Sequence, residues 1–135
     1  IKIKFIGNLN KLPTNLKSLL KSSEKKTSRF SKLQINIALN YGSKAEIVNS
    51  IKIINKKSLN VNIKNIEKNL FTSGIPNPDI LIRTGNTQRL SNFLLWQIAY
   101  TEIFFIKKLW PDFNKKNFKK ILNVFKTTKR NFGAI

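Results

Sequence analysis

The chain has 135 residues, of which 41% are hydrophobic, a length that supports one modest domain with a real core. Its formal net charge is +20, and it contains no Cys and no His. These absences exclude disulfides and thiolate chemistry, and six acids leave few residues for acid–base catalysis or a protein metal cage. With no run long enough to span a bilayer and no export signal pattern, the sequence indicates a soluble, cytoplasmic protein.

The charge alone suggests nucleic-acid binding, but its distribution argues against that function. Lysines are spread from Lys2 to Lys129 among many Ile and Asn residues, and no zinc-finger, basic-zipper or aromatic RNA-binding pattern is present. We therefore expect most lysines to be solvated and predict no nucleic-acid partner. Arginine is rare, since only Arg29, Arg83, Arg89 and Arg130 occur. Its planar set of donors matches phosphate or carboxylate geometry better than an ammonium does.

Strand and helix patterns alternate along the chain. Apolar alternation or short apolar runs predict strands at residues 1–5, 33–39, 79–82 and 102–106. Apolar residues at helical spacing predict helices around residues 12–20, 47–54, 63–70 and 118–125, and a helix of about nine residues capped by Ser91. Asn114 is predicted to cap the last helix, after a turn at residues 110–113. This order predicts a single α/β domain over residues 1–135, with a largely parallel sheet flanked by helices.

The loop after the third predicted strand is the strongest candidate site. Arg83 and Arg89 bracket it, Gly85 lets the backbone approach a ligand, and Ser91 begins the predicted helix. Ligands of open parallel sheets bind beyond the carboxyl ends of the strands, and helix N-termini favour anions. The loop therefore predicts a phosphate or diphosphate site. In the alternative interpretation, Arg83 pairs with Asp79 or Asp112 and Ser91 is only a helix cap.

The segment PDILIRTGNTQRLSNFLLWQIAYTEIFFIKKLWPDF, residues 78–113, closely resembles the C-terminal signature of the cis-prenyltransferases, the undecaprenyl diphosphate synthase family. The resemblance continues through INIALNYGSKAEIV at residues 35–48 and IGNLNKLP at residues 6–13. It implies an incomplete version of the cis-prenyltransferase fold. It also implies an enzyme of isoprenoid biosynthesis that condenses isopentenyl diphosphate, with magnesium, onto an allylic diphosphate such as farnesyl diphosphate.

The resemblance also implies roles for particular residues. Arg83, Arg89, Leu90 and Ser91 match the positions that bind the diphosphate of isopentenyl diphosphate. Glu102 matches the acid linked to Mg²⁺; from the residues alone, an exposed acid offsetting nearby lysines is an equal alternative. The apolar segment at residues 93–98 is core and, by resemblance, part of a homodimer interface. A long-chain product is expected to associate with membranes, which places the enzyme in the cytoplasm or peripheral to the membrane.

Several positions depart from the family pattern. Asn86 and Thr87 replace the usual Gly-Glu, and Gln88 stands where bacterial members commonly have histidine. Asn131 replaces the arginine of the family's Arg-Phe-Gly motif, and neither Lys129 nor Arg130 sits at the matching position. The loss of the acid and the imidazole at residues 86–88 argues against a proton or metal role for the loop itself.

The family's N-terminal Asp-Gly-Asn-Gly-Arg-Trp loop, which holds magnesium and the allylic diphosphate, has no match in these 135 residues. We therefore expect a C-terminal part of a longer protein, or the remnant of a decayed gene, that supplies the isopentenyl-diphosphate site and is inactive and poorly soluble alone. The alternative function is a non-catalytic subunit or diphosphate-binding remnant of the family.

Overall fold

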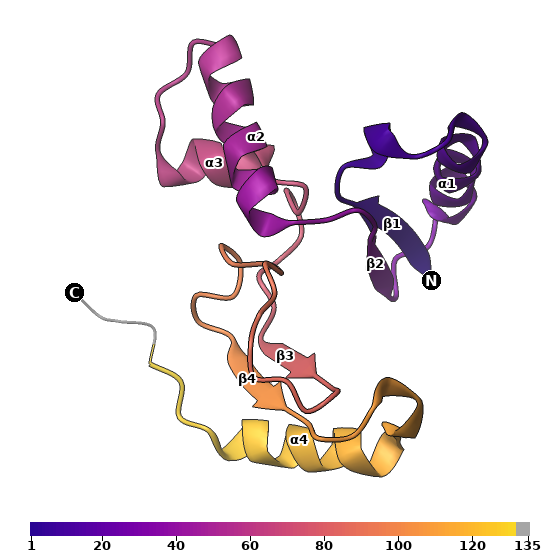
Figure 1. Cartoon of the computed structure of the whole chain (residues 1–135), viewed down its shortest axis with the longest axis vertical. Coiled ribbons are helices and arrows are strands. Elements are labelled where there is room, and N and C mark those ends of the chain that lie inside the picture. Colours follow the sequence, from indigo (N-terminus) through magenta and orange to yellow (C-terminus); the bar gives the residue numbers. More distant parts are fainter. Residues whose placement is uncertain (132–135) are drawn as a thin grey trace. The chain divides into compact units, whose positions relative to one another are not determined.

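A computed structural model describes residues 1–131 of the chain. The chain divides into two compact units, Ile1–Ile75 and the part from Pro76 onward, which are the indigo-to-magenta and the pink-to-yellow parts of Figure 1. Each unit is described by itself, so the prediction of one domain over residues 1–135 stays a prediction.

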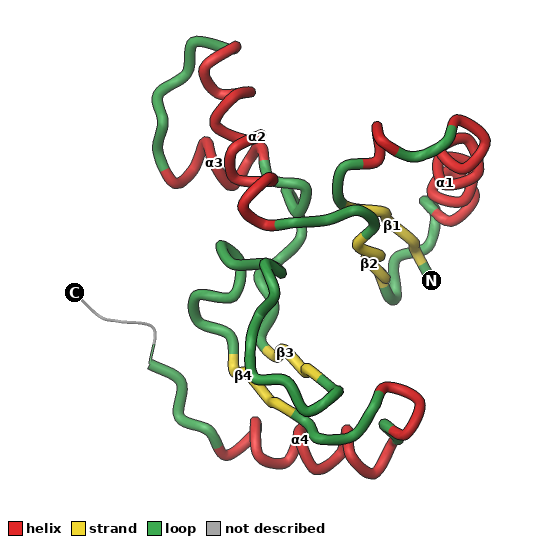
Figure 2. Tube along the Cα trace, viewed as in Figure 1, coloured by secondary structure: helices red, strands yellow, loops and turns green. Residues whose placement is uncertain are grey.

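The first unit combines a parallel strand pair with three α-helices (Figure 2). Its elements are β1 (Lys2–Ile6), a short 3-10 helix (Leu9–Lys11), α1 (Thr14–Thr27), β2 (Gln34–Ala38), α2 (Ser43–Lys56) and α3 (Ile63–Asn69). β1 and β2 pair in parallel from Lys2 opposite Gln34 to Ile6 opposite Ala38. α1 provides the crossover that a parallel pair needs, and its Glu24 side chain accepts a 2.8 Å hydrogen bond from the Phe5 backbone N–H.

The turn after β1 requires glycine. Gly7 is buried and has a φ of 119°, a conformation that side chains with a Cβ rarely adopt. A Cβ at this position would lie 2.1 Å from the backbone oxygen of Leu39. Gly7 therefore lets the chain leave β1 against the end of β2, where Asn8 N–H donates to the Asn40 oxygen at 3.2 Å.

The interior of the first unit contains a fully buried carboxylate. Glu46 on α2 has no exposed surface, and its two oxygens accept hydrogen bonds from the Tyr41 hydroxyl and, at 2.7 Å, from the Phe71 backbone N–H. Ser50, also fully buried, donates to the Ile66 oxygen on α3 at 2.9 Å. Since unpaired polar groups are costly inside a protein, these bonds fix α2 against α3 and the segment that follows it.

The second unit also has a parallel strand pair. Its elements are β3 (Ile80–Arg83), β4 (Glu102–Phe105), a 3-10 helix (Trp110–Asp112) and α4 (Lys115–Thr127). β3 and β4 pair from Ile80 opposite Glu102 to Arg83 opposite Phe105. As predicted, Asn114 caps α4: its side chain accepts from the backbone N–H groups of Lys116 and Asn117, while the Asn117 side chain returns a bond to the Asn114 N–H.

The predicted helix beginning at Ser91 is wrong, because residues 91–100 form successive turns. Ser91, Asn92 and Leu94 have φ values of 48°, 62° and 48°, in the left-handed region that an α-helix of L-residues cannot use. A nine-residue helix is marginal unless its apolar face is packed. Phe93 and Leu95 are 39% and 37% exposed, so packing does not supply that stability.

The order of the other strands and helices confirms the α/β prediction. Parallel strands alternate with helices, and within residues 1–131 the strands form two separate two-stranded sheets. Strand side chains such as Ile35, Ile37, Ile103 and Phe105 are 38–41% exposed. No helix of the described part is long and apolar enough to cross a membrane.

Candidate anion-binding site

The end of β4 holds the loop that follows β3. Ile106 N–H donates to the Arg83 oxygen at 2.7 Å, and Asn86 N–H donates to the Ile106 oxygen at 3.1 Å. Gly85, with a φ of 91°, donates its N–H to the Lys108 oxygen at 2.8 Å. These bonds extend the pairing beyond the strands, so the start of the loop is fixed at the carboxyl end of the sheet.

Two guanidinium groups and one hydroxyl group converge within this loop. Arg83 Nη1 donates to the Arg89 backbone oxygen and, at 3.1 Å, to Ser91 Oγ. Arg89 Nε donates to the same Ser91 Oγ at 3.3 Å. Because Ser91 Oγ accepts both bonds, its own hydrogen is directed elsewhere and can be donated to a ligand. The structure thus brings together the three polar side chains that the sequence predicted.

The two arginines are not neutralised by a carboxylate. Within residues 1–131, neither Arg83 nor Arg89 forms an ion pair, and Asp79 pairs instead with Arg130 at 2.6 Å. The alternative in which Arg83 pairs with Asp79 is therefore wrong. Two adjacent guanidinium groups repel each other without a counter-charge, so this arrangement favours the binding of an anion.

The cluster borders a cavity of about 330 Å³. Arg83, Thr84 and Ser91 supply its polar lining, and Leu81, Ile82, Leu90 and Phe93 supply its apolar lining. This volume lies at the lower end of the roughly 300–1,000 Å³ typical of small-molecule sites. The mixed lining suits a ligand with an anionic group and a short hydrocarbon portion.

The absence of a helix at Ser91 changes the physical basis of the site. Because residues 91–100 form turns, this segment provides no helix dipole and no set of free helical N–H groups for an anion. Anion binding here would instead depend on the Arg83 and Arg89 guanidiniums and the Ser91 hydroxyl. Each charge-assisted hydrogen bond contributes about 1.5–3 kcal/mol, so two or three of them are sufficient for a specific site.

The departures from the family pattern lie at the tip of the loop. Asn86 is exposed with a φ of 54°, a conformation that Asn tolerates better than most residues. Thr87 Oγ1 donates to the Gly85 oxygen at 3.1 Å, and Gln88 is exposed. In this structure the segment shapes a turn and lies outside the set of residues that line the cavity.

Glu102 lies at the other end of the strand pair. It pairs with Ile80 at the start of the parallel register, whereas Arg83 stands at its end. Three residues of strand place the two levels about 10 Å apart. The described residues contain no group of three acids that could hold a metal ion. A magnesium ion on Glu102 would therefore need phosphate and water oxygens as its remaining ligands, a coordination that Mg²⁺ commonly adopts.

Arg130 has a structural role. Its guanidinium donates to Asp79 Oδ1 at 2.6 Å and to the Tyr100 oxygen at 3.1 Å, which ties the segment after α4 to the residue before β3 and to the turns before β4. It therefore does not replace, at the Arg83 cluster, the arginine that the family has at the position of Asn131. The rest of that motif, Phe132 and Gly133, lies outside the described residues.

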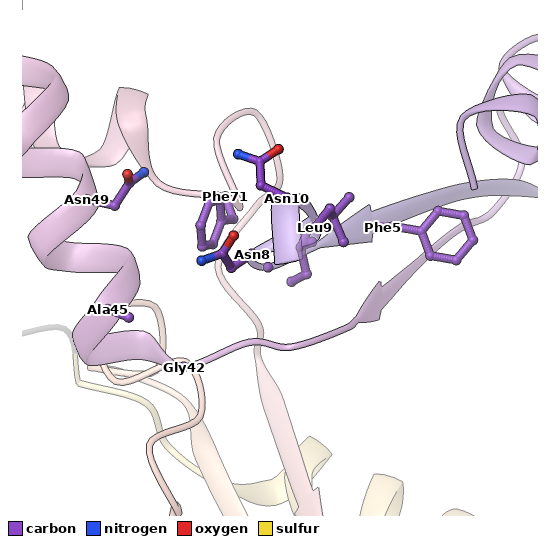
Figure 3. A pocket seen from close by; sticks show the side chains of 10 residues that line it. Phe5, Asn8, Leu9, Asn10, Gly42, Ala45, Asn49 and Phe71 are labelled. Carbon is purple, nitrogen blue, oxygen red and sulfur yellow. The ribbon is translucent and has the colours of Figure 1, made fainter. Parts of the chain in front are cut away.

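A second cavity, of about 400 Å³, lies in the first unit and was not predicted. Asn8 and Asn10 follow β1, while Ala45 and Asn49 lie on α2, and Phe71 contributes an aromatic ring (Figure 3). Gly7 and Asn8, which follow the first predicted strand, are the sequence signal that could have indicated this position. Its polar lining is amide rather than charged, so this cavity has less attraction for a diphosphate than the Arg83 cluster.

Comparisons with known proteins agree with the sequence resemblance. The family described as "Putative undecaprenyl diphosphate synthase" matches residues 1–133. An isoprenyl transferase from Prochlorococcus marinus subsp. pastoris is 46% identical over 142 aligned residues that include the whole chain. The crystal structure of a "probable undecaprenyl diphosphate synthase" from Campylobacter jejuni superposes with a TM-score of 0.91 at 36% identity over 98% of this chain. Lavandulyl diphosphate synthase from Lavandula x intermedia, solved with dimethylallyl diphosphate, has a TM-score of 0.89 at 30% identity, also over 98% of this chain.

The chain spans only part of these relatives: 52% of the Prochlorococcus protein, and 63% and 60% of the two solved chains. Within that part, the family match covers nearly every residue, and the strands and helices superpose closely. The chain therefore belongs to the cis-prenyltransferase, or undecaprenyl diphosphate synthase, family.

Proposed function

We propose that this chain is the C-terminal part of a cis-prenyltransferase and supplies its isopentenyl-diphosphate site. The complete enzyme would condense isopentenyl diphosphate with an allylic diphosphate of the farnesyl diphosphate type, to give a cis-polyprenyl diphosphate such as undecaprenyl diphosphate. The observation that carries this proposal is the convergence of Arg83 and Arg89 on the Ser91 hydroxyl beside a cavity that Arg83 and Ser91 line, with no acidic partner among residues 1–131.

The site matches the two parts of isopentenyl diphosphate. The guanidiniums and the Ser91 hydroxyl would hold the diphosphate, while Leu90 and Phe93 would contact the short hydrocarbon portion. In this role the loop binds and orients one substrate and performs no proton transfer. Mg²⁺ held by Glu102 would lie about 10 Å along the strands from the level of Arg83 and would take its remaining ligands from phosphate and water oxygens. Activation of the allylic substrate would need residues beyond these 135, so we expect the chain alone to be inactive.

Steady-state kinetics of the complete enzyme test the assignment of substrate. Arg89→Ala should raise the KM for isopentenyl diphosphate about tenfold or more, because it removes a charge-assisted contact to that substrate. The KM for the allylic substrate should change much less. Arg29→Ala, just after α1 in the first unit, is the matched control and should change neither constant. Equal increases in both KM values for Arg89→Ala would overturn the assignment.

A non-catalytic subunit is the second candidate function. Two observations favour it: Asn131 stands in place of the motif arginine, and Arg130 is engaged with Asp79. Such a subunit would raise the activity of a separate catalytic chain. Arg89→Ala would then leave the KM for isopentenyl diphosphate unchanged while the stimulation persists, a result that separates the two functions.

We also propose that the complete protein forms a homodimer. Apolar side chains of the second unit are exposed at Phe93, Leu95, Tyr100, Ile103 and Phe105, between 37% and 59%. Exposed apolar side chains in this number are typical of an interaction surface. Sedimentation of the complete protein should give a dimer, and Phe93→Asp with Ile103→Asp should shift it toward the monomer.

A further inference from the structure

An apolar groove runs between β4 and α4 in the second unit. Phe104 and Ile106 line it from the strand side, and Ile121 and Val124 line it from the helix. The cavity measures about 340 Å³. Ile121 is buried, whereas Val124 is 48% exposed, so the apolar face of α4 is only partly covered by the strands. Its volume is sufficient for a short hydrocarbon chain.

Three lysines form the rim of this groove. Lys107 and Lys108 follow β4, and Lys120 lies on α4, with Asn117 as a further polar neighbour. All three lysines are exposed, and within residues 1–131 none of them forms an ion pair. An apolar floor beside three unneutralised ammonium groups is complementary to a molecule with a hydrocarbon tail and an anionic head.

We infer that this groove is a second binding site, for an amphiphilic anion composed of a short apolar chain and a phosphate-type head. The exposed Lys107, Lys108 and Lys120 at the rim favour an anionic head, and the apolar floor favours a short hydrocarbon tail. The requirement for a tail and an anionic head follows from the groove alone. The choice of a prenyl diphosphate as that ligand rests on the proposed function.

The groove is distinct from the cavity at the arginine cluster. The arginine cavity is lined by residues of the segments 81–84 and 90–93, and the groove by residues of the segments 104–108 and 117–124. The groove uses lysines where the first site uses arginines and a hydroxyl. Ammonium groups bind phosphate as mobile point charges, without the bidentate geometry of guanidinium, so this site is expected to be less selective for the head group.

Calorimetric titration with geranyl diphosphate tests the inference. The full chain is used in an Arg89→Ala background, which weakens the first site. Lys108→Ala with Lys120→Ala should lower the affinity about tenfold, since two charge contacts are lost. Lys116→Ala with Lys119→Ala removes the same charge from exposed positions of α4 outside the groove and should leave the affinity within about twofold. Equal losses for both pairs would overturn the site in favour of unspecific attraction to a basic surface.

The apolar floor is tested by a second pair of variants. Val124→Ser should lower the affinity for geranyl diphosphate several-fold, whereas Phe118→Ser, at an equally exposed position outside the groove, should not. Inorganic diphosphate, which has no tail, should bind the groove weakly and without sensitivity to Val124→Ser. If neither serine variant changes the affinity, the tail does not enter the groove and the inference fails.

A further ligand, dodecyl phosphate, compared with geranyl diphosphate, distinguishes an isoprenoid tail from an unbranched one. Dodecyl phosphate shares the tail-and-head chemistry without isoprenoid branching. If both ligands bind and both lose affinity in the Lys108 and Lys120 variant, the groove is a general site for lipid phosphates. If only geranyl diphosphate binds, the groove is an isoprenoid site. If the lysine variant binds both as the parent does, while Arg89→Ala still impairs isopentenyl diphosphate use, the groove inference fails and the proposed function stands.

Discussion

The two units of the chain use polar side chains in opposite ways. In the first unit, the Glu46 carboxylate is completely buried and both its oxygens accept protein hydrogen bonds. In the second, Arg83 and Arg89 gather around the Ser91 hydroxyl at the edge of a cavity, and no carboxylate of the described residues 1–131 pairs with them. A buried carboxylate whose oxygens accept protein hydrogen bonds stabilises the fold, whereas positively charged donors without a counter-charge can bind an anionic ligand. We therefore expect the first cluster to contribute to stability and propose that the second binds a ligand.

The largest effect is expected at Glu46. Glu46→Ala leaves the Tyr41 hydroxyl and the Phe71 N–H without their acceptor in a buried place, which should cost about 2–4 kcal/mol of unfolding free energy. Urea denaturation, followed by far-UV circular dichroism, measures this loss. Glu67→Ala, an exposed acid on α3, should cost less than about 0.5 kcal/mol. Similar losses for both variants would break the assignment of a structural role to Glu46.

A smaller effect is expected from Arg83→Lys. One guanidinium nitrogen of Arg83 donates to both the Arg89 oxygen and Ser91 Oγ. A lysine ammonium cannot make these two bonds and also present a planar set of donors to the ligand. The affinity for isopentenyl diphosphate should fall about tenfold, or about 1.4 kcal/mol, with little change in stability. Equilibrium dialysis against the labelled substrate measures it, with Arg29→Lys as the control of equal chemistry. A stability loss as large as that of Glu46→Ala would mean that Arg83 is structural.

The smallest effect concerns the scaffold of the second unit. Asn114→Ala removes the reciprocal cap of α4 and should cost about 1 kcal/mol of stability. The affinity for isopentenyl diphosphate should stay unchanged, because the cap is separate from the residues that line the arginine cavity. Asn123→Ala, at an exposed position in the middle of α4, is the control. A parallel loss of affinity would show that the loop depends on the last helix.

The sequence predicted the positions of the strands more reliably than which side chains are buried. Alternating and apolar runs located the four described strands to within about two residues. Asn114 was predicted as a cap because Asn just before an apolar helical pattern is a local signal for a helix start. The site residues Arg83, Arg89 and Ser91 were predicted from rare arginines at a strand end. Their convergence is seen in the structure, and their binding role stays a proposal.

Two features could not be predicted from local pattern. The apolar run after Ser91 has helical spacing, but the left-handed backbone at Leu94 is decided by whether neighbouring elements pack on that run. The burial of Glu46 was also missed, since its partners Tyr41 and Phe71 are five and 25 residues away and no local signal joins them. Both depend on tertiary contacts, which a propensity or a period does not encode.

The most direct measurement of the diphosphate site uses the four arginines themselves. With ¹⁵N-labelled arginine, the full chain gives guanidinium NMR signals from Arg29, Arg83, Arg89 and Arg130 alone. Addition of isopentenyl diphosphate should shift and sharpen the signals of Arg83 and Arg89, because charge-assisted hydrogen bonds slow their exchange with water. Arg29, over the Phe30 ring, and Arg130, paired with Asp79, should stay unchanged. Equal shifts at all four arginines, or shifts that spare Arg83 and Arg89, would contradict the proposed site.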